Sequence, residues 1–108
     1  MYELFQSEKT EKYHFRLKAG NGEQILQSQG YKDKAGCLNG IASVTKNGCD
    51  ESRFEKKEAS NGKFYFVLKA GNGQIIGQSQ QYKTQSGRDN GIASVGKNCE
   101  GKTKDLTA

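Results

Sequence analysis

The chain has 108 residues, of which 32% are hydrophobic, and it carries 17 lysine and arginine residues against 12 aspartate and glutamate residues. This length suits one small domain with a lean core, and no apolar run approaches the roughly 18 residues of a membrane-spanning helix. The first residues lack the apolar stretch of a secretory signal and the three cysteines cannot all pair, so we predict a cytoplasmic protein that does not bind membranes.

The chain contains the same pattern twice. Residues 13–47 and 64–98 align at an offset of 51, and 22 of these 35 paired positions are identical. Two segments match completely between the copies, Lys18–Gly22 with Lys69–Gly73 and Asn39–Val44 with Asn90–Val95. A tandem duplication this close indicates two copies of one supersecondary unit.

Residues 1–108 are predicted to form a single domain, built of a first repeat at 1–51 and a second repeat at 52–108. The two repeats should share one core, because about 50 residues bury too little surface to fold well alone. The first repeat holds seven basic and seven acidic residues, whereas the second holds ten and five. A basic second repeat could favour an acidic partner such as nucleic acid, but scattered surface lysines that keep the protein soluble are the simpler explanation.

Each copy is predicted to begin with three strands, which are Tyr2–Gln6, Tyr13–Lys18 and Glu23–Gln29 in the first copy and Phe54–Lys57, Phe64–Lys69 and Gln74–Gln80 in the second. The middle strand of each copy alternates apolar and polar residues, which indicates one buried face. Asn21-Gly22 and Asn72-Gly73 follow it, and Asn-Gly favours a type I′ hairpin turn, in which both central residues have positive φ. The facing of the third strand stays open, because the apolar residues of the two copies do not coincide there.

A helix is predicted from about Lys34 to Asn47, with its equivalent in the second copy. Its apolar stripe consists of Cys37, Ile41 and Val44, and that of the second copy consists of Ile92, Val95 and Cys99. Gly48 lies where a C-cap glycine is expected. Gly40 and Gly91 lie inside the helices at a cost of up to about 1 kcal/mol each, so we infer that they allow a close approach to the sheet or to the other helix.

Three strands and a helix, repeated, predict an α+β fold with both helices on one face of an antiparallel sheet. The motifs Leu-Lys-Ala-Gly-Asn-Gly and Asn-Gly-Ile-Ala-Ser-Val in both copies, and the stretch from Phe54 to Phe66, resemble the YegP-like family of tandem-repeat bacterial proteins. The function of that family is not established, so the resemblance transfers no catalytic residue. It implies two β3-α-β repeats in one pseudo-twofold sheet, with the C-terminal strands around 51–57 and 102–106 exchanged between the repeats. The alternative for the tail at 102–107 is that it frays.

The sequence contains no arrangement typical of an enzyme or of a cofactor site. Gly-Asn-Gly at 20–22 joins two strands, whereas a phosphate-binding loop leads into a helix, so a hairpin turn is expected. His14 is the only histidine and the second copy has Tyr65 in its place. Structural zinc sites need four ligands in paired spacing, and a general base needs a positioned partner. We therefore expect a non-enzymatic protein without a catalytic residue, a metal or a cofactor.

The three cysteines are predicted to be inert. Cys37 and Cys99 lie on the apolar helix stripes, where a free thiol behaves as a small hydrophobic group. Cys49 and Cys99 lie near helix C-termini, whose partial negative charge disfavours a thiolate. Incidental oxidation is the alternative.

The best candidate for a binding site is the sheet face that the helices leave open. Arg16 and Lys18 of the first copy, and Tyr65 and Lys69 of the second, are predicted to project from this face. Basic and aromatic residues interleaved on a sheet can bind single-stranded nucleic acid, although a solvated strand face is the simpler explanation.

Two matched tyrosines, Tyr31 and Tyr82, are expected to anchor the loops that lead into the helices. The duplicated unit and the open sheet face together predict a monomeric binding or accessory module whose partner is unknown. Weak nucleic-acid binding is the alternative.

Overall fold

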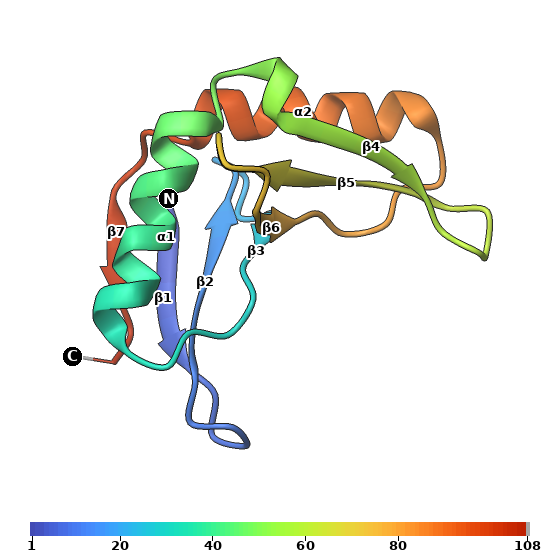
Figure 1. Cartoon of the computed structure of the whole chain (residues 1–108). Coiled ribbons are helices and arrows are strands. Elements are labelled where there is room, and N and C mark those ends of the chain that lie inside the picture. Colours follow the sequence, from blue (N-terminus) through green and yellow to red (C-terminus); the bar gives the residue numbers. More distant parts are fainter. Residues whose placement is uncertain (108) are drawn as a thin grey trace.

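The computed structural model describes residues 1–107, which form seven strands, two helices and one 3-10 turn (Figure 1). The elements are β1 (Tyr2–Gln6), β2 (Tyr13–Lys18), β3 (Gln24–Gln27), α1 (Lys34–Asn47), η1 (Glu51–Arg53), β4 (Phe54–Glu58), β5 (Phe64–Lys69), β6 (Ile75–Gln78), α2 (Gln85–Asn98) and β7 (Thr103–Asp105). Each helix begins at a side chain that caps it: Asp33 accepts a hydrogen bond from the Gly36 amide at 2.7 Å, and Thr84 accepts one from the Gly87 amide at 3.0 Å.

The strands form one sheet in the order β4-β5-β6-β3-β2-β1-β7, and both helices cover the same face of it (Figure 1). The predicted α+β fold is confirmed. The sheet is mixed rather than wholly antiparallel, because β7 runs parallel to β1. The predicted exchange is present: the chain that leaves α2 becomes β7 at the edge of the first repeat, and the chain that leaves α1 becomes β4 beside β5.

One buried cluster contains side chains from both repeats. Helix α1 packs on β2 of its own repeat and on β5 and β6 of the other, while α2 packs on β5 and also on β2 and β3. Both predicted helix stripes, Cys37, Ile41 and Val44 together with Ile92, Val95 and Cys99, are buried in this cluster. Each helix therefore buries its apolar face against strands of both repeats.

The predicted type I′ turns are wrong. Gly22 and Gly73 have φ of +84° and +86°, but Asn21 and Asn72 do not have positive φ. The Gly22 amide donates to the Ala19 carbonyl at 2.9 Å, so each glycine follows a tight turn instead of standing at its centre. A positive-φ glycine after such a turn is typical of a longer hairpin loop with a bulge.

A second irregularity, within the β2–β3 ladder itself, explains the facing of β3, which the alternation could not decide. The register between β2 and β3 shifts after Leu17, and Ile25 and Leu26 are consecutive and both buried. Gly77 of β6 is equivalent to Leu26, and a Cβ atom placed on it would lie 2.8 Å from the Leu26 side chain. Near the pseudo-twofold axis there is room for only one of the two side chains.

Gly40 and Gly91 permit the close approach that the sequence predicted, and the neighbour is the sheet. A Cβ atom on Gly40 would overlap the Tyr31 hydroxyl and lie 2.9 Å from a ring carbon of Phe15. A Cβ on Gly91 would meet Tyr82 at 2.8 Å. The two tyrosines thus hold the loops against the helices, as expected.

Acidification is expected to loosen β7. Hydrogen bonds from Thr107 and then the ion pair with Lys34, at 3.0 Å, lower the pKa of Asp105 from 3.8 to about 2. A depressed carboxyl pKa stabilises the folded state above the unfolded value, and this contribution disappears as the pH falls through the folded value. The protection of the amides of residues 103–106, measured as exchange relative to the intrinsic rate at each pH, should therefore fall between about pH 4 and pH 2.

In the Asp105→Asn variant, protection of the same segment should already be lower at neutral pH and should show no further fall between about pH 4 and pH 2. An Asp105 carboxyl that titrates near 3.8 in the folded wild type would contradict this explanation.

Candidate functional site

The four side chains predicted to bind nucleic acid occupy the open sheet face in two separate groups. Arg16 and Lys18 lie on β2, whereas Tyr65 and Lys69 lie on β5, and strands β3 and β6 separate them. Arg16 and Lys18 meet at one carboxylate, whereas Tyr65 and Lys69 only share a strand. The structure does not join the two groups in one continuous site.

The first group is built around Glu3 of β1. Arg16 Nε lies 2.6 Å and Lys18 Nζ lies 3.3 Å from the same carboxylate oxygen. The hydrogen bond from Arg16 is the main reason that the pKa of Glu3 lies below its usual range. The Arg16 guanidinium also lies 4.6 Å from the centre of the Phe5 ring, on which the His14 ring stacks at 5.5 Å. Arg16 is thus already engaged by a carboxylate and an aromatic ring.

The second group has the same plan around Glu55 of β4. Lys69 Nζ lies 2.5 Å and Lys57 Nζ lies 3.7 Å from this carboxylate, and the contact with Lys69 lowers the pKa of Glu55. Tyr65 faces Lys57 across the β4–β5 ladder. Val67 lies between Tyr65 and Lys69 on β5, and the strand alternation predicts that it projects from the same face, but it is only 2% exposed.

Each group therefore sets two cations against one carboxylate, which leaves one net positive charge in each. Between the groups lies a hollow of about 390 Å³ that bears only uncharged polar side chains, Gln24, Gln27, Ser28, Gln78, Ser79 and Gln80. A phosphate backbone would have to displace Glu3 and Glu55 to reach the cations. Nucleic-acid binding by this face remains a prediction. Another part of the surface has a more selective geometry.

A more defined site becomes visible when the edge strands β1 and β4 are compared. Tyr2 pairs with Leu17, and Phe54 pairs with Leu68, which is the repeat equivalent of Leu17. Tyr2 of β1 therefore corresponds to Phe54 of β4, and by the same register Leu4 corresponds to Lys56.

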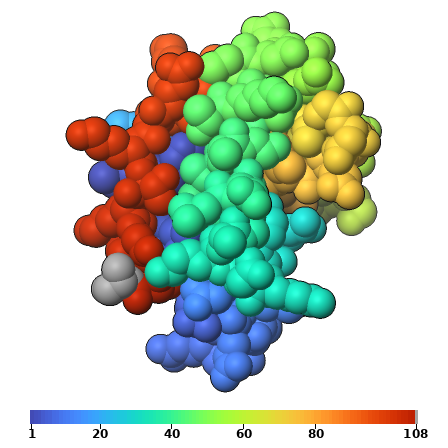
Figure 2. Space-filling model, turned by 60° about the vertical axis from the view of Figure 1, so that its left-hand side comes forward, coloured from blue at the N-terminus to red at the C-terminus, as the bar shows by residue number. Residues whose placement is uncertain are grey.

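The edge at β1 is covered. The Tyr2 amide donates to the Lys102 carbonyl and the Leu106 amide donates to the Leu4 carbonyl, both at 2.8 Å, so that β7 completes the sheet. Tyr2 and Leu4 are fully buried. Figure 2 shows the C-terminal segment, in red, directly beside α1, in green.

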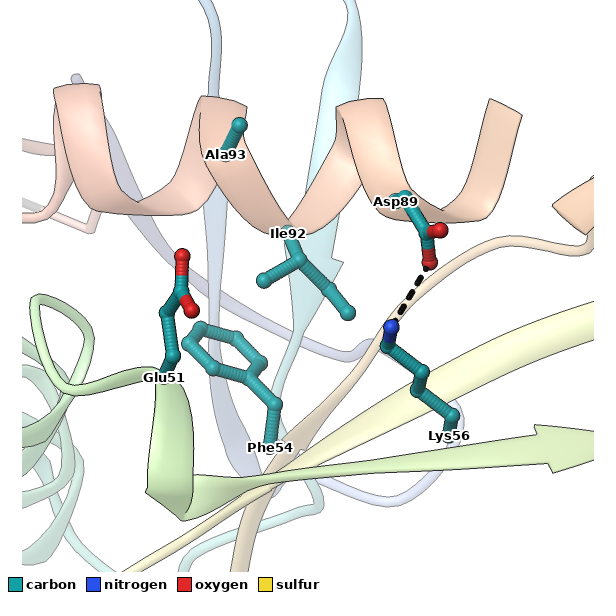
Figure 3. Close-up of a pocket in the computed structure, with 6 residues that line it drawn as sticks. All are labelled: Glu51, Phe54, Lys56, Asp89, Ile92 and Ala93. Atoms are coloured by element: carbon teal, nitrogen blue, oxygen red, sulfur yellow. Dashed lines mark ion pairs between the residues drawn. The ribbon is translucent and has the colours of Figure 1, made fainter. Parts of the chain in front are cut away.

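The equivalent edge at β4 is uncovered, since within residues 1–107 β5 is the one strand that pairs with β4. A groove of about 290 Å³ lies between this edge and α2, and we refer to it as the β4–α2 groove (Figure 3). Its lining consists of Glu51, Phe54, Lys56, Asp89, Ile92 and Ala93.

The side chains of the β4–α2 groove combine an apolar floor with a charged rim. Phe54 and Ile92 point toward each other from β4 and α2 (Figure 3). At one end Lys56 Nζ lies 3.2 Å from the Asp89 carboxylate, and both side chains are about half exposed, at 53% and 49%. At the other end stands Glu51 (Figure 3). The groove can therefore accept an apolar side chain in its centre and polar atoms at both ends.

Sequence reasoning missed this groove. The strand Phe54–Lys57 was predicted, but the equivalence of Lys56 with the buried Leu4 depends on a register one residue longer than the 51-residue offset. The available signal was the lysine itself, a charged residue where the equivalent strand of the first repeat has the apolar Leu4.

The sequence relationships agree with this architecture. Residues 8–55 and residues 59–105 each match the family described as "Domain of unknown function (DUF1508)". The chain belongs to the DUF1508 family. It is 55% identical over 107 residues to the UPF0339 protein YegP of Escherichia coli O157:H7, which covers 98% of this chain and 96% of that relative.

Solved DUF1508 relatives have the same fold. The solution NMR structure of UPF0339 protein SO3888 from Shewanella oneidensis is 51% identical, covers 97% of this chain and 89% of that one, and has a TM-score of 0.90. The solution NMR structure of YegP from E. coli, a protein of unknown function, is 53% identical with a TM-score of 0.91, at 97% and 90% coverage. The resemblance to the YegP-like family is confirmed, and the family is one of unknown function.

Within residues 1–107 of this DUF1508 protein, no group of three or more histidine, cysteine or acidic side chains is placed to hold a metal ion. In the same residues, neither helix is long and apolar enough to cross a membrane. Cys37 is buried, as predicted for the apolar stripe, and burial raises the pKa of its thiol to about 11.

Proposed function

We propose that this protein is a non-enzymatic binding module that receives an extended segment of a partner protein in the β4–α2 groove. The segment pairs with β4 as an additional parallel strand and places one apolar side chain over Phe54 and Ile92. The observation that carries this proposal is the covered edge at β1, where the chain's own β7 occupies the equivalent place.

Backbone geometry supports addition of a strand at β4. In β1, Tyr2 and Leu4 direct backbone hydrogen bonds to β7. By equivalence, Lys56 directs its amide and carbonyl away from β5 and toward the open edge. Exposed strand edges recruit extended peptides in this way, with main-chain hydrogen bonds providing affinity and side-chain pockets providing specificity.

The lining of the groove indicates the chemistry of the segment. The volume of about 290 Å³ leaves ample room for a side chain of the size of leucine over the apolar floor. The ion pair between Lys56 and Asp89 at one end is solvent-accessible, so it can exchange partners with polar groups of the segment at little cost. The cations of the open face are held by Glu3 and Glu55, which favours the groove over that face.

The test is a selection of random octapeptides against the wild-type protein, with counter-selection against Ala93→Arg, which fills the groove from α2. Selected peptides should contain a central aliphatic residue and should shift the amide resonances of β4 and of the adjacent turn of α2. In Lys56→Pro, which lacks the outward amide but keeps the β4–β5 ladder, binding should weaken at least about tenfold, the value of roughly one lost hydrogen bond.

Ala42→Arg is the matched control, because it places the same side chain at the equivalent position of α1 and should leave peptide binding unchanged. Peptides that bind Lys56→Pro and wild type equally, or that shift the open face around Arg16 and Lys69, would contradict the proposal. A concentration-dependent dimer that Ala93→Arg abolishes would identify a second copy as the occupant and would also contradict it.

A further inference from the structure

The C-terminal ends of the two helices bring two thiols into direct contact. Cys49, two residues beyond α1, has its sulfur 2.8 Å from the sulfur of Cys99, the C-cap residue of α2. That separation is less than 1 Å longer than a disulfide bond of about 2.05 Å. The two sulfur atoms therefore have to approach each other by less than 1 Å to form a bond.

The surrounding backbone holds the two cysteines in this arrangement. A Cβ atom on Gly48 would lie 2.8 Å from the Cβ of Cys99 and 3.4 Å from a methyl group of Val95, so the chain just before Cys49 lies directly against α2. Gly48 is the C-cap of α1, but its φ of −66° does not require glycine, and this close contact does. On the other side, the Tyr2 hydroxyl donates to the Cys99 carbonyl at 2.7 Å.

The two thiols have different access to solvent. Cys49 is exposed and Cys99 is fully buried. Burial is also the main reason that the pKa of the Cys99 thiol is raised to about 12. An oxidant in solution therefore reaches Cys49 first, and Cys99 is placed to attack whatever forms there.

The sequence predicts inert thiols, but the direct contact of Cys49 with Cys99 favours oxidation instead. We propose that these two cysteines are an oxidative cross-linking site that joins the two repeats covalently and reversibly when the protein meets a hydroperoxide. The Cys49 thiolate attacks one peroxide oxygen, the O–O bond breaks, and the sulfur becomes a sulfenic acid while the other oxygen leaves as water or an alcohol. The Cys99 sulfur then attacks the sulfenic sulfur, the S–O bond breaks, and hydroxide leaves with the Cys99 proton as water. Two electrons pass from the two sulfurs to one peroxide, and a dithiol reductant returns them.

The third cysteine is excluded from this reaction by its position. Cys37 lies in the first turn of α1, about 15 Å along the helix from the end that precedes Cys49. Its burial among the core side chains prevents both access by the oxidant and contact with the pair.

The experiment treats the intact protein with hydrogen peroxide and maps the cysteines after digestion with trypsin. Trypsin separates all three, because Cys37, Cys49 and Cys99 fall in residues 35–46, 47–53 and 98–102. We expect loss of two hydrogen atoms per molecule and a linked pair of peptides 47–53 and 98–102. The thermal midpoint should rise by about 10 °C, because the bond closes a loop of about 50 residues, and dithiothreitol should reverse the change.

Cys37→Ser is the matched control and should cross-link like wild type, whereas Cys49→Ser, at an exposed position, should fold normally and lose the cross-link. Oxidation that stops at sulfinic acid on Cys49, a cross-link that includes Cys37, or disulfides only between molecules would each overturn the proposal. Peptide mapping of the wild-type protein decides the matter even if variants of buried Cys99 do not fold.

Discussion

Each half of the chain, produced without the other, is expected to remain unfolded. A polypeptide of residues 1–51 would contain α1 but not β5 and β6, on which this helix packs, and β1 would lack β7. A polypeptide of residues 52–108 would lack the β2 and β3 surface that α2 covers. Chains of about 50 residues bury too small a fraction of their surface to offset the entropy of folding without such support.

Circular dichroism and amide-shift dispersion of the two polypeptides at low micromolar concentration measure this directly. When mixed in equal amounts they should associate one to one and regain the spectrum of the intact chain, since the contacts that join the halves are the same. The intact chain at the same concentration is the control. A half that unfolds cooperatively as a monomer would show that the repeats do not depend on a shared core.

Exchange of two side chains at the pseudo-twofold axis is the second prediction with a large effect. Leu26→Gly alone should lower the free energy of unfolding by about 4 kcal/mol, through the cavity and the added backbone freedom. Gly77→Leu alone should lower it by about 3 kcal/mol, because its side chain would enter the space of Leu26. Both losses are large against the roughly 5–15 kcal/mol of a small domain.

The double variant, Leu26→Gly with Gly77→Leu, should recover about 3 kcal/mol relative to the sum of the single effects. The φ of Gly77 is not positive, so leucine can adopt its backbone conformation, and the vacated volume at position 26 lies directly opposite. Denaturant midpoints at an unchanged slope give these values. Ile75→Leu, at an exposed position of β6, should be nearly neutral. Additivity of the two single effects within about 0.5 kcal/mol would contradict the shared space.

Some features of the fold could be predicted because the local sequence and the tertiary packing favour the same secondary structure and the same buried face. The stripe of Cys37, Ile41 and Val44 predicted a helix with the bounds that α1 has, and the alternation from Tyr13 to Lys18 predicted β2 and its buried face. Gly40 could be interpreted as a point of close approach, because a helix-interior glycine in both copies has a cost that only packing offsets.

Other features depended on distant partners. Asn21-Gly22 predicted a turn but the wrong type, and the register shift that allows both Ile25 and Leu26 to be buried depends on pairing with β2. The parallel direction of β7 depends on the crossover after α2, and short tails carry no signal for direction.

Of the candidate sites, the sequence located the open-face residues but not their partners. Arg16 and Lys69 are on the predicted face, yet their charges are compensated by Glu3 and Glu55, which come from neighbouring strands. Nothing in the spacing of Cys49 and Cys99 indicated contact, because they lie 50 residues apart on different repeats.

The amino-acid sequence alone determined the duplication, the kinds and order of the elements, and the faces that must be buried, because periodicity and turn residues act within a few positions of the chain. Only the tertiary structure decided which edge of the sheet is covered and which stays open, where one of two equivalent side chains must be glycine, and which thiols meet. Those outcomes arise near the pseudo-twofold axis, where side chains of two similar repeats occupy one space, and at the sheet edges, where a single terminal strand covers one edge only.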